Sequence, residues 1–496
     1  MWGVPMIRQT STAAVLIFAC AFLASCSGAP GGGCVSDCGG GNASISLVLT
    51  ATPPNPTAQL SIQTLTATIA GITLTPATGA AVNVSLNSSA YIADFNRVTS
   101  DSTLLARQVS VPAGNYTQMA ITFSAPRVTY CTQANPGVPG CAAGTLQSIT
   151  GAAGTATIST SFSIAANQQS GIALNANIGN ALTLNGQTVA AVNLGAANIF
   201  SATALPPSSA TTDLASGEFS HLDDVMGMVT GMSGSTLTVQ TSTRGNITAT
   251  ANSSTQFSAD CITLGFAQDF TCVKANTIAI VDTLLNADGT LTLVFYQPLP
   301  AAIFAGDLLE GVVTSVPNSV TGQFTVVVTD SVSASSGSLL SGQLRLGDQI
   351  VVTLSSPNPF QIVSKGLQIP TGSTFQHSTS VADILPGQTV AIAVSAFTAQ
   401  SGSTPGTASS QNLALRFTRF TAVIGTATLP VFNATNFPPF FGLATGQQLQ
   451  TTSGRLSLDG VSNLTSIAAG GTFSTTALYV GPPVTPSFSV LSVRAH

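Results

Sequence analysis

Charged side chains are the scarcest feature of this sequence. Only 6% of the 496 residues are charged, and the chain has two lysines (Lys274 and Lys365) and two glutamates (Glu218 and Glu310), whereas globular chains average about a quarter charged residues. Helices draw their exposed faces from Lys, Glu, Arg and Gln, so a mainly helical fold is excluded. The net charge of −5 is weak and scattered. It offers no basic face, and we expect no nucleic-acid partner.

Tryptophan and histidine are almost as rare, which bears on binding and catalysis. Trp2 is the single tryptophan, and the five tyrosines are dispersed along the chain, so the usual stacking platforms for sugars are missing. The three histidines (His221, His377 and His496) leave few general bases for a hydrolase. The sequence also contains no Gly-x-Ser-x-Gly, no His-Glu-x-x-His and no glycine-rich phosphate loop. It therefore predicts neither an enzyme nor a cofactor.

A long apolar run is also absent, but a short one lies near the start. The run from Ala13 to Ala24 follows Arg8 and is too short to span a bilayer as a mature helix. Its end, Leu23–Cys26, reads Leu-Ala-Ser-Cys, which is typical of a lipobox. We expect the signal to be removed and Cys26 to carry lipid in the cell envelope. Ser27 favours the outer membrane by resemblance to enterobacterial sorting rules. The alternative is an ordinary secretory signal that contains a cysteine.

Six further cysteines fall into three neighbouring pairs. Local disulfides in an oxidising compartment are each worth about 2–3 kcal/mol on the loop-entropy model. Fifteen pairings are formally possible, and proximity favours Cys34–Cys38, Cys131–Cys141 and Cys261–Cys272. The first of these pairs is the least secure because its three-residue spacer lies in a glycine-rich tether. Zinc is the alternative, but it needs four convergent ligands and no histidine lies near a pair in sequence.

The residues that are abundant predict strands. Thr, Ser, Val, Ala, Gly and Asn dominate, and Val82–Leu86 alternates strictly as a half-buried strand does. Internal repeats follow, since Val225–Gly231 resembles Leu309–Ser315 and Thr236–Thr241 resembles Phe324–Thr329. We expect an all-β chain: an N-terminal β-sandwich followed by two full and one degenerate small β-barrel-like units. The expected boundaries are signal 1–25, tether 26–43, sandwich 44–204, linker 205–217, and repeats 218–300, 301–424 and 425–496.

Several short motifs resemble known families. The lipobox and the turn Val111–Tyr116 resemble an uncharacterised bacterial lipoprotein family with a prealbumin-like β-sandwich. The Gly311–Thr314 opening, with Ser373–Phe375 and Gly387–Val390, resembles a second uncharacterised family of small β-barrel repeats. The ending Leu491–His496 is similar to closures in such proteins. The resemblance implies the fold and a lipoprotein, and it implies no activity or catalytic residue.

Two segments are candidates for a site. Glu218–Asp224 gathers His221, Asp223 and Asp224, which could supply ligands to a divalent cation. A solvated lead-in segment with turn-capping aspartates is the favoured interpretation, because no Asp-x-Asp-x-Asp-Gly loop follows. Asn433–Phe441 is an aromatic and proline-rich stretch. It forms either a lid over the core of the third unit or a contact patch for a partner, and we favour the lid.

These observations predict a lipid-anchored protein of the cell envelope with a non-catalytic role in binding, adhesion or scaffolding. Its expected partners are the membrane, through the N-terminal lipid, and an envelope protein or glycan. The alternative is a substrate-binding lipoprotein, for a carbohydrate or a small molecule, that serves an uptake or degradation system. A pocket lined by convergent polar groups would favour the alternative, whereas filled barrel interiors would favour the scaffold.

Overall fold

The fold was taken from a computed structural model. The structure describes residues 41–496, apart from residues 57–59, 90, 133–136, 143, 205–220, 287–288, 301–303, 305, 335–336, 368, 370–371, 429, 444–446, 452–456, 460–463, 465–466 and 482–486. The signal, the linker 205–217, Cys26, Cys34 and Cys38 therefore lie outside the described residues, as does all but the end of the tether. The described chain is almost entirely β, which confirms the predicted fold class.

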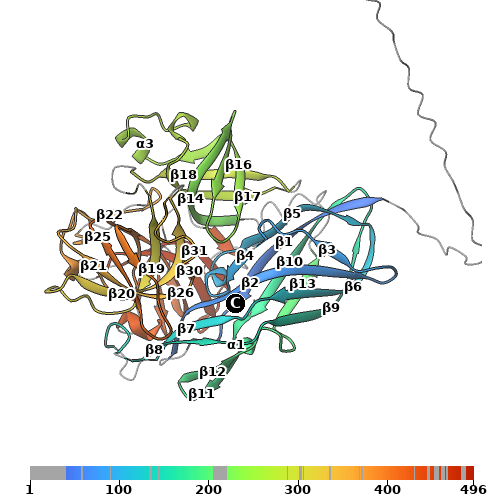
Figure 1. Ribbon diagram of the computed structural model, residues 1–496, viewed down its shortest axis with the longest axis horizontal. Coiled ribbons are helices and arrows are strands. Elements are labelled where there is room, and N and C mark those ends of the chain that lie inside the picture. The colour runs from blue at the N-terminus through green and yellow to red at the C-terminus, as the bar shows by residue number, and fades with distance from the viewer. Residues whose placement is uncertain are drawn as a thin grey trace, which may run out of the picture. The chain divides into compact units, whose positions relative to one another are not determined.

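The first part is a sandwich of two sheets, the blue to green strands in Figure 1. One sheet has the order β13 (Phe200–Ala204), β10 (Gln169–Asn177), β1 (Asn42–Thr52) and β5 (Thr103–Pro112). The other has the order β8 (Leu146–Thr150), β7 (Arg127–Thr132), β2 (Leu60–Pro76), β6 (Gly114–Phe123) and β9 (Gly154–Ile164), with β3 (Val82–Val84) and β4 (Tyr91–Asp94) also paired to β2. The short elements are η1 (Arg97–Thr99), α1 (Ile178–Ala181) and the hairpin β11 (Leu182–Asn185) and β12 (Thr188–Val192).

Alternation fixes which side chains fill the sandwich. In β9, Ala156, Ile158 and Phe162 point into the core, while the threonines and serines between them are exposed or half-buried. The Val111–Tyr116 turn joins β5 to β6, and the Tyr116 hydroxyl donates to the carbonyl of Pro112 at 2.7 Å. This tyrosine is therefore structural, and its buried ring stacks on Phe162.

The first barrel unit is a closed ring of five strands. Its order is β14 (His221–Ser233), β15 (Thr236–Gln240), β16 (Asn246–Phe257), β18 (Leu291–Pro298) and β17 (Ile278–Leu285), and β17 pairs back to β14. The third and fifth strands of the unit, β16 and β18, are parallel and all other pairs are antiparallel. Chain order 1-2-3-5-4 with this single parallel pair is that of a Greek-key barrel of the OB type. Leu237, Val239, Ile247 and Leu293 fill its interior.

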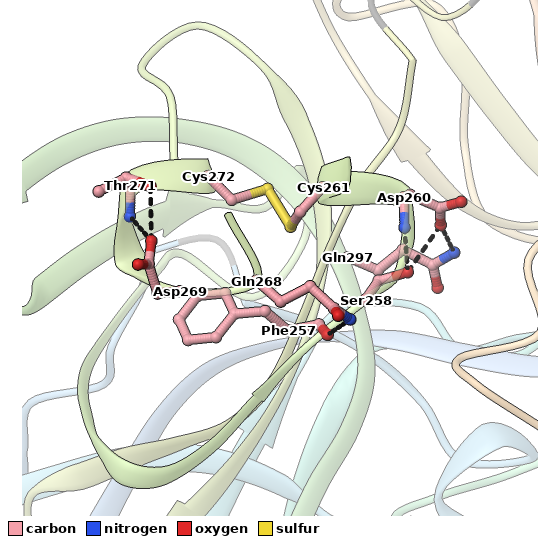
Figure 2. The surroundings of a disulfide bond; sticks show 9 residues. All are labelled: Phe257, Ser258, Asp260, Cys261, Gln268, Asp269, Thr271, Cys272 and Gln297. Atoms are coloured by element: carbon pink, nitrogen blue, oxygen red, sulfur yellow. Dashed lines mark hydrogen bonds between the residues drawn. A yellow bond between two sulfur atoms is a disulfide. The ribbon is translucent and has the colours of Figure 1, made fainter. Parts of the chain in front are cut away.

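A disulfide closes the connection between the third and fourth strands of this unit. Cys261 lies in α3 (Asp260–Thr263) and Cys272 lies in η2 (Phe270–Cys272), and Figure 2 shows the bond between these two short helices. Asp269 caps η2 by accepting the backbone N–H of Thr271 at 2.8 Å. On the other side, Asp260 accepts a bond from Gln297 of β18, which ties the connection to the barrel wall.

The second barrel unit has a ring of the same kind, but its third and fifth strands are each divided into two segments. It contains β19 (Leu308–Val313), β20 (Gln323–Val332), β21 (Gln349–Leu354), β22 (Gln361–Ile362), η3 (Val381–Asp383), β23 (Thr389–Ala393), β24 (Ala396–Thr398), β25 (Gly406–Ser410) and β26 (Leu413–Thr428). The third strand of the ring is split into β21 and β22, which run parallel to β25 and to the start of β26. Four antiparallel pairs complete the ring: β19 with β20, β20 with β21, β26 with β23, and β23 with β19.

The third barrel unit begins inside the same strand that ends the second. Beyond β26 it contains β27 (Val431–Thr435), η4 (Pro439–Phe441), β28 (Gln447–Thr451), β29 (Ser457–Asp459), β30 (Thr472–Tyr479) and β31 (Phe488–Ala495). The ring order β26, β27, β28, β31, β30 and back to β26 matches that of the first unit, and the third and fifth strands are again parallel. The unit is therefore degenerate in sequence but complete in strand order.

Candidate functional site

The few charges of this chain are concentrated in its interior. Eleven charged side chains contact one another or neighbouring backbone where the sandwich meets the barrel units, and all are at most a tenth exposed. We call this group the charge cluster; its members are Arg97, Asp101, Asp224, Arg244, Asp282, Glu310, Asp330, Lys365, Arg416, Arg419 and Arg494. Buried charges persist only when they are paired and hydrogen-bonded. The cluster therefore joins segments that are distant in sequence.

Arg416 lies at the centre of the charge cluster and is fully buried. Its Nε donates to Glu310 Oε2 of β19 at 2.8 Å, and its Nη2 donates to Asp224 Oδ1 of β14 at 2.9 Å. Burial opposes its charge, yet Asp224 and Glu310 raise the pKa of Arg416 above its ordinary value. One guanidinium thus ties the first strand of the first barrel unit to the first strand of the second.

Arg97 brings the sandwich into the same cluster. It lies in η1, its Nη1 is 3.4 Å from Asp330 Oδ2 of β20, and its Nη2 donates to the carbonyl of Asp224 at 2.9 Å. Burial opposes the charged form, but the carboxylates, Asp330 first, raise the pKa of Arg97. From the C-terminal strand β31, Arg494 donates to the carbonyl of Asp101 at 2.6 Å. The sandwich is thereby bonded to all three barrel units.

A bulge in β14 places Asp224 in this network. The pairing of β14 with β17 shifts between Leu222 and Val225, and Asp224 has a φ of +56°. Its N–H donates to Asp282 Oδ1 at 2.7 Å, and Asp282 also pairs with Lys365. Burial raises the pKa of the Asp224 carboxyl, but Arg416 and the neighbouring cations outweigh it and hold that pKa below its usual range.

Two of the three candidate metal ligands, Asp223 and Asp224, have hydrogen-bond partners within the protein. The carboxylate of Asp224 accepts from Arg416 and Arg419, and the backbone N–H of Asp223 donates to Asp101 Oδ1 at 3.3 Å. His221 pairs through its backbone with Leu284 at the start of β14. In the part of the chain that is described, no group of three or more His, Cys, Asp or Glu is placed to hold a metal ion.

A pocket opens beside the charge cluster, and we call it the Arg419 pocket. It has a volume of about 160 Å³ and lies between the sandwich and strand β26 with the loop after β27. One wall carries Pro54, Pro56, Ile62 and Leu182, and the opposite wall carries Val312, Phe420, Pro438 and Phe440. Arg419, Asn96 and Asn436 add polar groups to this mainly apolar lining. Such a combination of apolar walls with a few polar groups is typical of small-molecule sites.

Arg419 is less well compensated than its neighbour Arg416. Within the described residues its hydrogen bond is from Nη2 to Asp224 Oδ2 at 3.3 Å, and Asp101 Oδ2 lies 4.0 Å away. Its Nε has no hydrogen-bond partner among these residues. Burial and the nearby Arg97 lower the pKa of Arg419, whereas the pKa of Arg416 is raised. Arg419 therefore retains capacity to bind an anion.

The sequence-based disulfide assignments can be compared with the described residues. The structure contains Cys131–Cys141 and Cys261–Cys272, with sequence separations of 10 and 11. Sequence reasoning found these local pairs because they are neighbours in the chain. It missed the Arg419 pocket and the charge cluster, in which the bonded members Asp101 and Arg494 are 393 residues apart in sequence.

The aromatic stretch Asn433–Phe441 belongs to the core of the third barrel unit. Phe437, Phe440 and Phe441 are all buried. Phe437 packs on Phe420 and on Phe488 with ring centroids 5.1 and 5.4 Å apart. The structure supports the interpretation as a lid over this core, and Asn436, Pro438 and Phe440 of the stretch also line the Arg419 pocket.

In the first barrel unit, threonine side chains cover the face that OB-type barrels commonly use to bind ligands. Such barrels bind oligonucleotides and oligosaccharides on their second and third strands, and nucleic-acid sites combine cations with stacking aromatic rings. In the first barrel unit this face carries cross-strand threonine pairs, Thr236 with Thr250 and Thr238 with Thr248, each 3.0 Å apart. Arg107 of the sandwich donates to the carbonyl of Thr248 at 3.3 Å. The face is therefore partly engaged within the chain.

No helix in the described residues is both long and apolar enough to cross a membrane. Comparison with known proteins identifies no family: no family model and no curated protein matches the chain. Two solved structures show weak similarity. A Drosophila Unr chain, CSD456, has 6% identity and a TM-score of 0.13, covering 55% of this chain and 97% of its own. A multidomain protein with nucleic acid binding domains from Streptococcus pneumoniae has 10% identity and a TM-score of 0.10, covering 54% and 71%. At these TM-scores neither structure indicates a function for this chain.

Proposed function

We propose that the chain is a lipid-anchored, non-catalytic protein of the cell envelope, attached through Cys26 at the outer membrane, whose folded part is a stable platform for binding, adhesion or scaffolding. The charge cluster is the main observation in support of a stable platform. It bonds the sandwich to every barrel unit through side chains that are nearly all buried. The barrel interiors are filled by apolar side chains, as a scaffold requires. An envelope protein or glycan remains the proposed partner.

Anchoring is tested at Cys26. The N-terminal peptide of the mature protein should begin at Cys26 and show acyl mass in mass spectrometry, and the protein should sediment with membranes. Cys26→Ser should release or misprocess the protein, while Ser27→Ala, its neighbour, should still sediment. An unmodified mature terminus would contradict this proposal.

The platform is tested where the sandwich meets the first barrel unit. Replacing Asp223 and Asp224 together by alanine removes the Asp224 carboxylate that Arg416 and Arg419 bind. Small-angle scattering of the full chain should then change without loss of the β signal in circular dichroism. Asp269→Ala is the matched control, because within the described residues this exposed aspartate bonds to Thr271 of its own turn. An unchanged scattering profile would count against a platform held by the cluster, and loss of a bound metal in elemental analysis would favour a metal-dependent function.

A second function, substrate binding, is favoured by one observation, the Arg419 pocket. Its arginine and asparagines converge on one cavity, which a scaffold does not require. A substrate-binding lipoprotein would use this pocket while the rest of the platform holds the two walls together.

A further inference from the structure

We propose that the Arg419 pocket binds a small carboxylic acid whose body is a single apolar ring. The proposal rests on the substrate-binding alternative and names its ligand class. It is independent of anchoring, because anchoring is read from the acyl mass on Cys26. A negative binding result therefore leaves the lipoprotein assignment intact.

The polar end of the pocket selects a carboxylate. Arg419 lines the pocket with a side chain that is nine-tenths buried, and its Nε has no partner among the described residues. Ser61, which is 4% exposed, also lines the pocket, and its Oγ likewise has no partner in the described part. Buried polar atoms are nearly always hydrogen-bonded in proteins. A carboxylate accepts several hydrogen bonds at once, and an arginine fork matches its geometry.

The cluster behind Arg419 keeps this cation available. Asp224 is shared with Arg416, which it meets at 2.9 Å, so its bond to Arg419 at 3.3 Å is the longer one. Asp101 is 4.0 Å from Arg419, and its backbone carbonyl is bonded to Arg494. A ligand carboxylate would add the compensation that Arg416 obtains from Glu310.

The walls and the volume select the body of the ligand. Prolines and aromatic rings on the two sides, Pro54, Pro56, Phe420 and Phe440, leave a space of about 160 Å³. An apolar cavity of roughly 150 Å³ holds one benzene ring. A planar ring stacked between prolines and phenylalanines leaves its carboxylate toward Arg419. A sugar acid of the same size would bring hydroxyl groups against walls that offer few partners.

The test uses the purified full chain in mild detergent and three probes. Benzoate carries the ring and the charge, benzamide has the same shape without the charge, and glucuronate has the charge on a polar body. Isothermal titration calorimetry should give a saturable benzoate isotherm with a dissociation constant below about 1 mM, as expected for so few atoms. Benzamide and glucuronate should each bind at least tenfold more weakly, because a charge-assisted hydrogen bond is stronger than a neutral one and apolar walls cannot satisfy hydroxyl groups.

Two variants locate the binding. Arg419→Gln should weaken benzoate at least tenfold and leave benzamide unchanged, whereas Arg345→Gln, at an exposed arginine, should alter neither. Leu182→Trp fills the pocket from its half-buried rim without touching the charge cluster, and it should abolish binding of both ring compounds. If Arg419→Gln does not fold, Leu182→Trp and the benzamide comparison decide the question. Absence of benzoate binding, equal affinity for glucuronate, or full affinity in Leu182→Trp would overturn the proposal.

Discussion

Arg416→Met is expected to destabilise the protein strongly, because it leaves two buried carboxylates without their shared cation. Arg416 has no exposed surface and bonds Glu310 at 2.8 Å and Asp224 at 2.9 Å. Breaking a buried ion pair from one side typically costs about 3–5 kcal/mol. Asp224 retains Arg419 at 3.3 Å and Glu310 retains Arg97 at 3.8 Å. We therefore expect a loss of about 3 kcal/mol in the free energy of unfolding, near the lower end of that range.

Urea denaturation at pH 7, followed by tyrosine fluorescence and circular dichroism, measures this loss. Arg345→Met is the matched control, since Arg345 is exposed, and its effect should stay within about 0.5 kcal/mol. The double variant Arg416→Met with Glu310→Gln should recover part of the loss, because it removes one of the two uncompensated charges. A single variant as stable as the control would refute the view that the cluster holds ionised, mutually dependent pairs.

The stability lost in Arg416→Met should also depend on pH, in a direction that follows from the pKa of Asp224. In the folded protein the cations around Asp224 hold its pKa below the ordinary value, although burial opposes them. A carboxyl with a depressed folded pKa stabilises the fold above its unfolded pKa of about 3.9 and loses that contribution as the pH falls below it. In Arg416→Met this depression is reduced. The difference between the variant and the native protein should therefore be largest near pH 7 and shrink towards pH 3.

Three further predictions concern single sites. Replacing Cys261 and Cys272 by alanine should lower the stability of the first barrel unit by about 2–3 kcal/mol, because the bridge closes a short loop, and hydrogen exchange should quicken in β14–β18 and not in the sandwich. Asp94→Asn keeps the acceptor for both backbone bonds and removes a carboxyl whose pKa burial raises to about 6. The native protein should lose stability as the pH rises from about 4 to 6, and the variant should therefore be more stable than the native protein by about 3 kcal/mol at pH 7 and equally stable at pH 4 in urea denaturation. Gly387→Ala places a Cβ 2.3 Å from a phenylalanine ring at a φ of +90°, and should lower the melting temperature more than Gly372→Ala, which has a similar φ of +89° and open space.

The strands could be predicted from the sequence because their signal is local. Val82–Val84 alternates inside a longer alternating segment, and it forms β3. The bounds of the strands are harder to derive from the sequence. Leu65–Ile69 and Gly71–Leu74 each have the pattern of a separate short strand, but both are parts of the 17-residue β2. Gly71 is compatible with a turn, but it pairs with Thr122 of β6 directly after a register shift, and the strand continues through it. Tertiary pairing thus outweighs local propensity.

The site could not be predicted, because its contacts depend on register between distant strands. Asp224 was noticed as part of a polar segment, but the bulge that turns it towards Arg416 has no signature in its neighbours. Arg97 and Asp330 are 233 residues apart, and the sequence around either residue gives no indication of the other. The one indication in the sequence is the small number of charged residues, because in a chain with so few charges each is expected to have a definite partner.

Strand β26 has a consequence for how this chain can be divided. Its first residues pair with β23 in the second barrel unit, and the partner changes to β30 between Arg416 and Phe417. No spacer separates the two units, so neither can be excised, exchanged or permuted as an independent cassette without cutting a continuous backbone ladder. A pulling force applied along β26 would reach both hydrogen-bonded rings together. We therefore expect the last two barrel units to be exchanged and to unfold under force as one unit, although their sequences resemble two separate repeats.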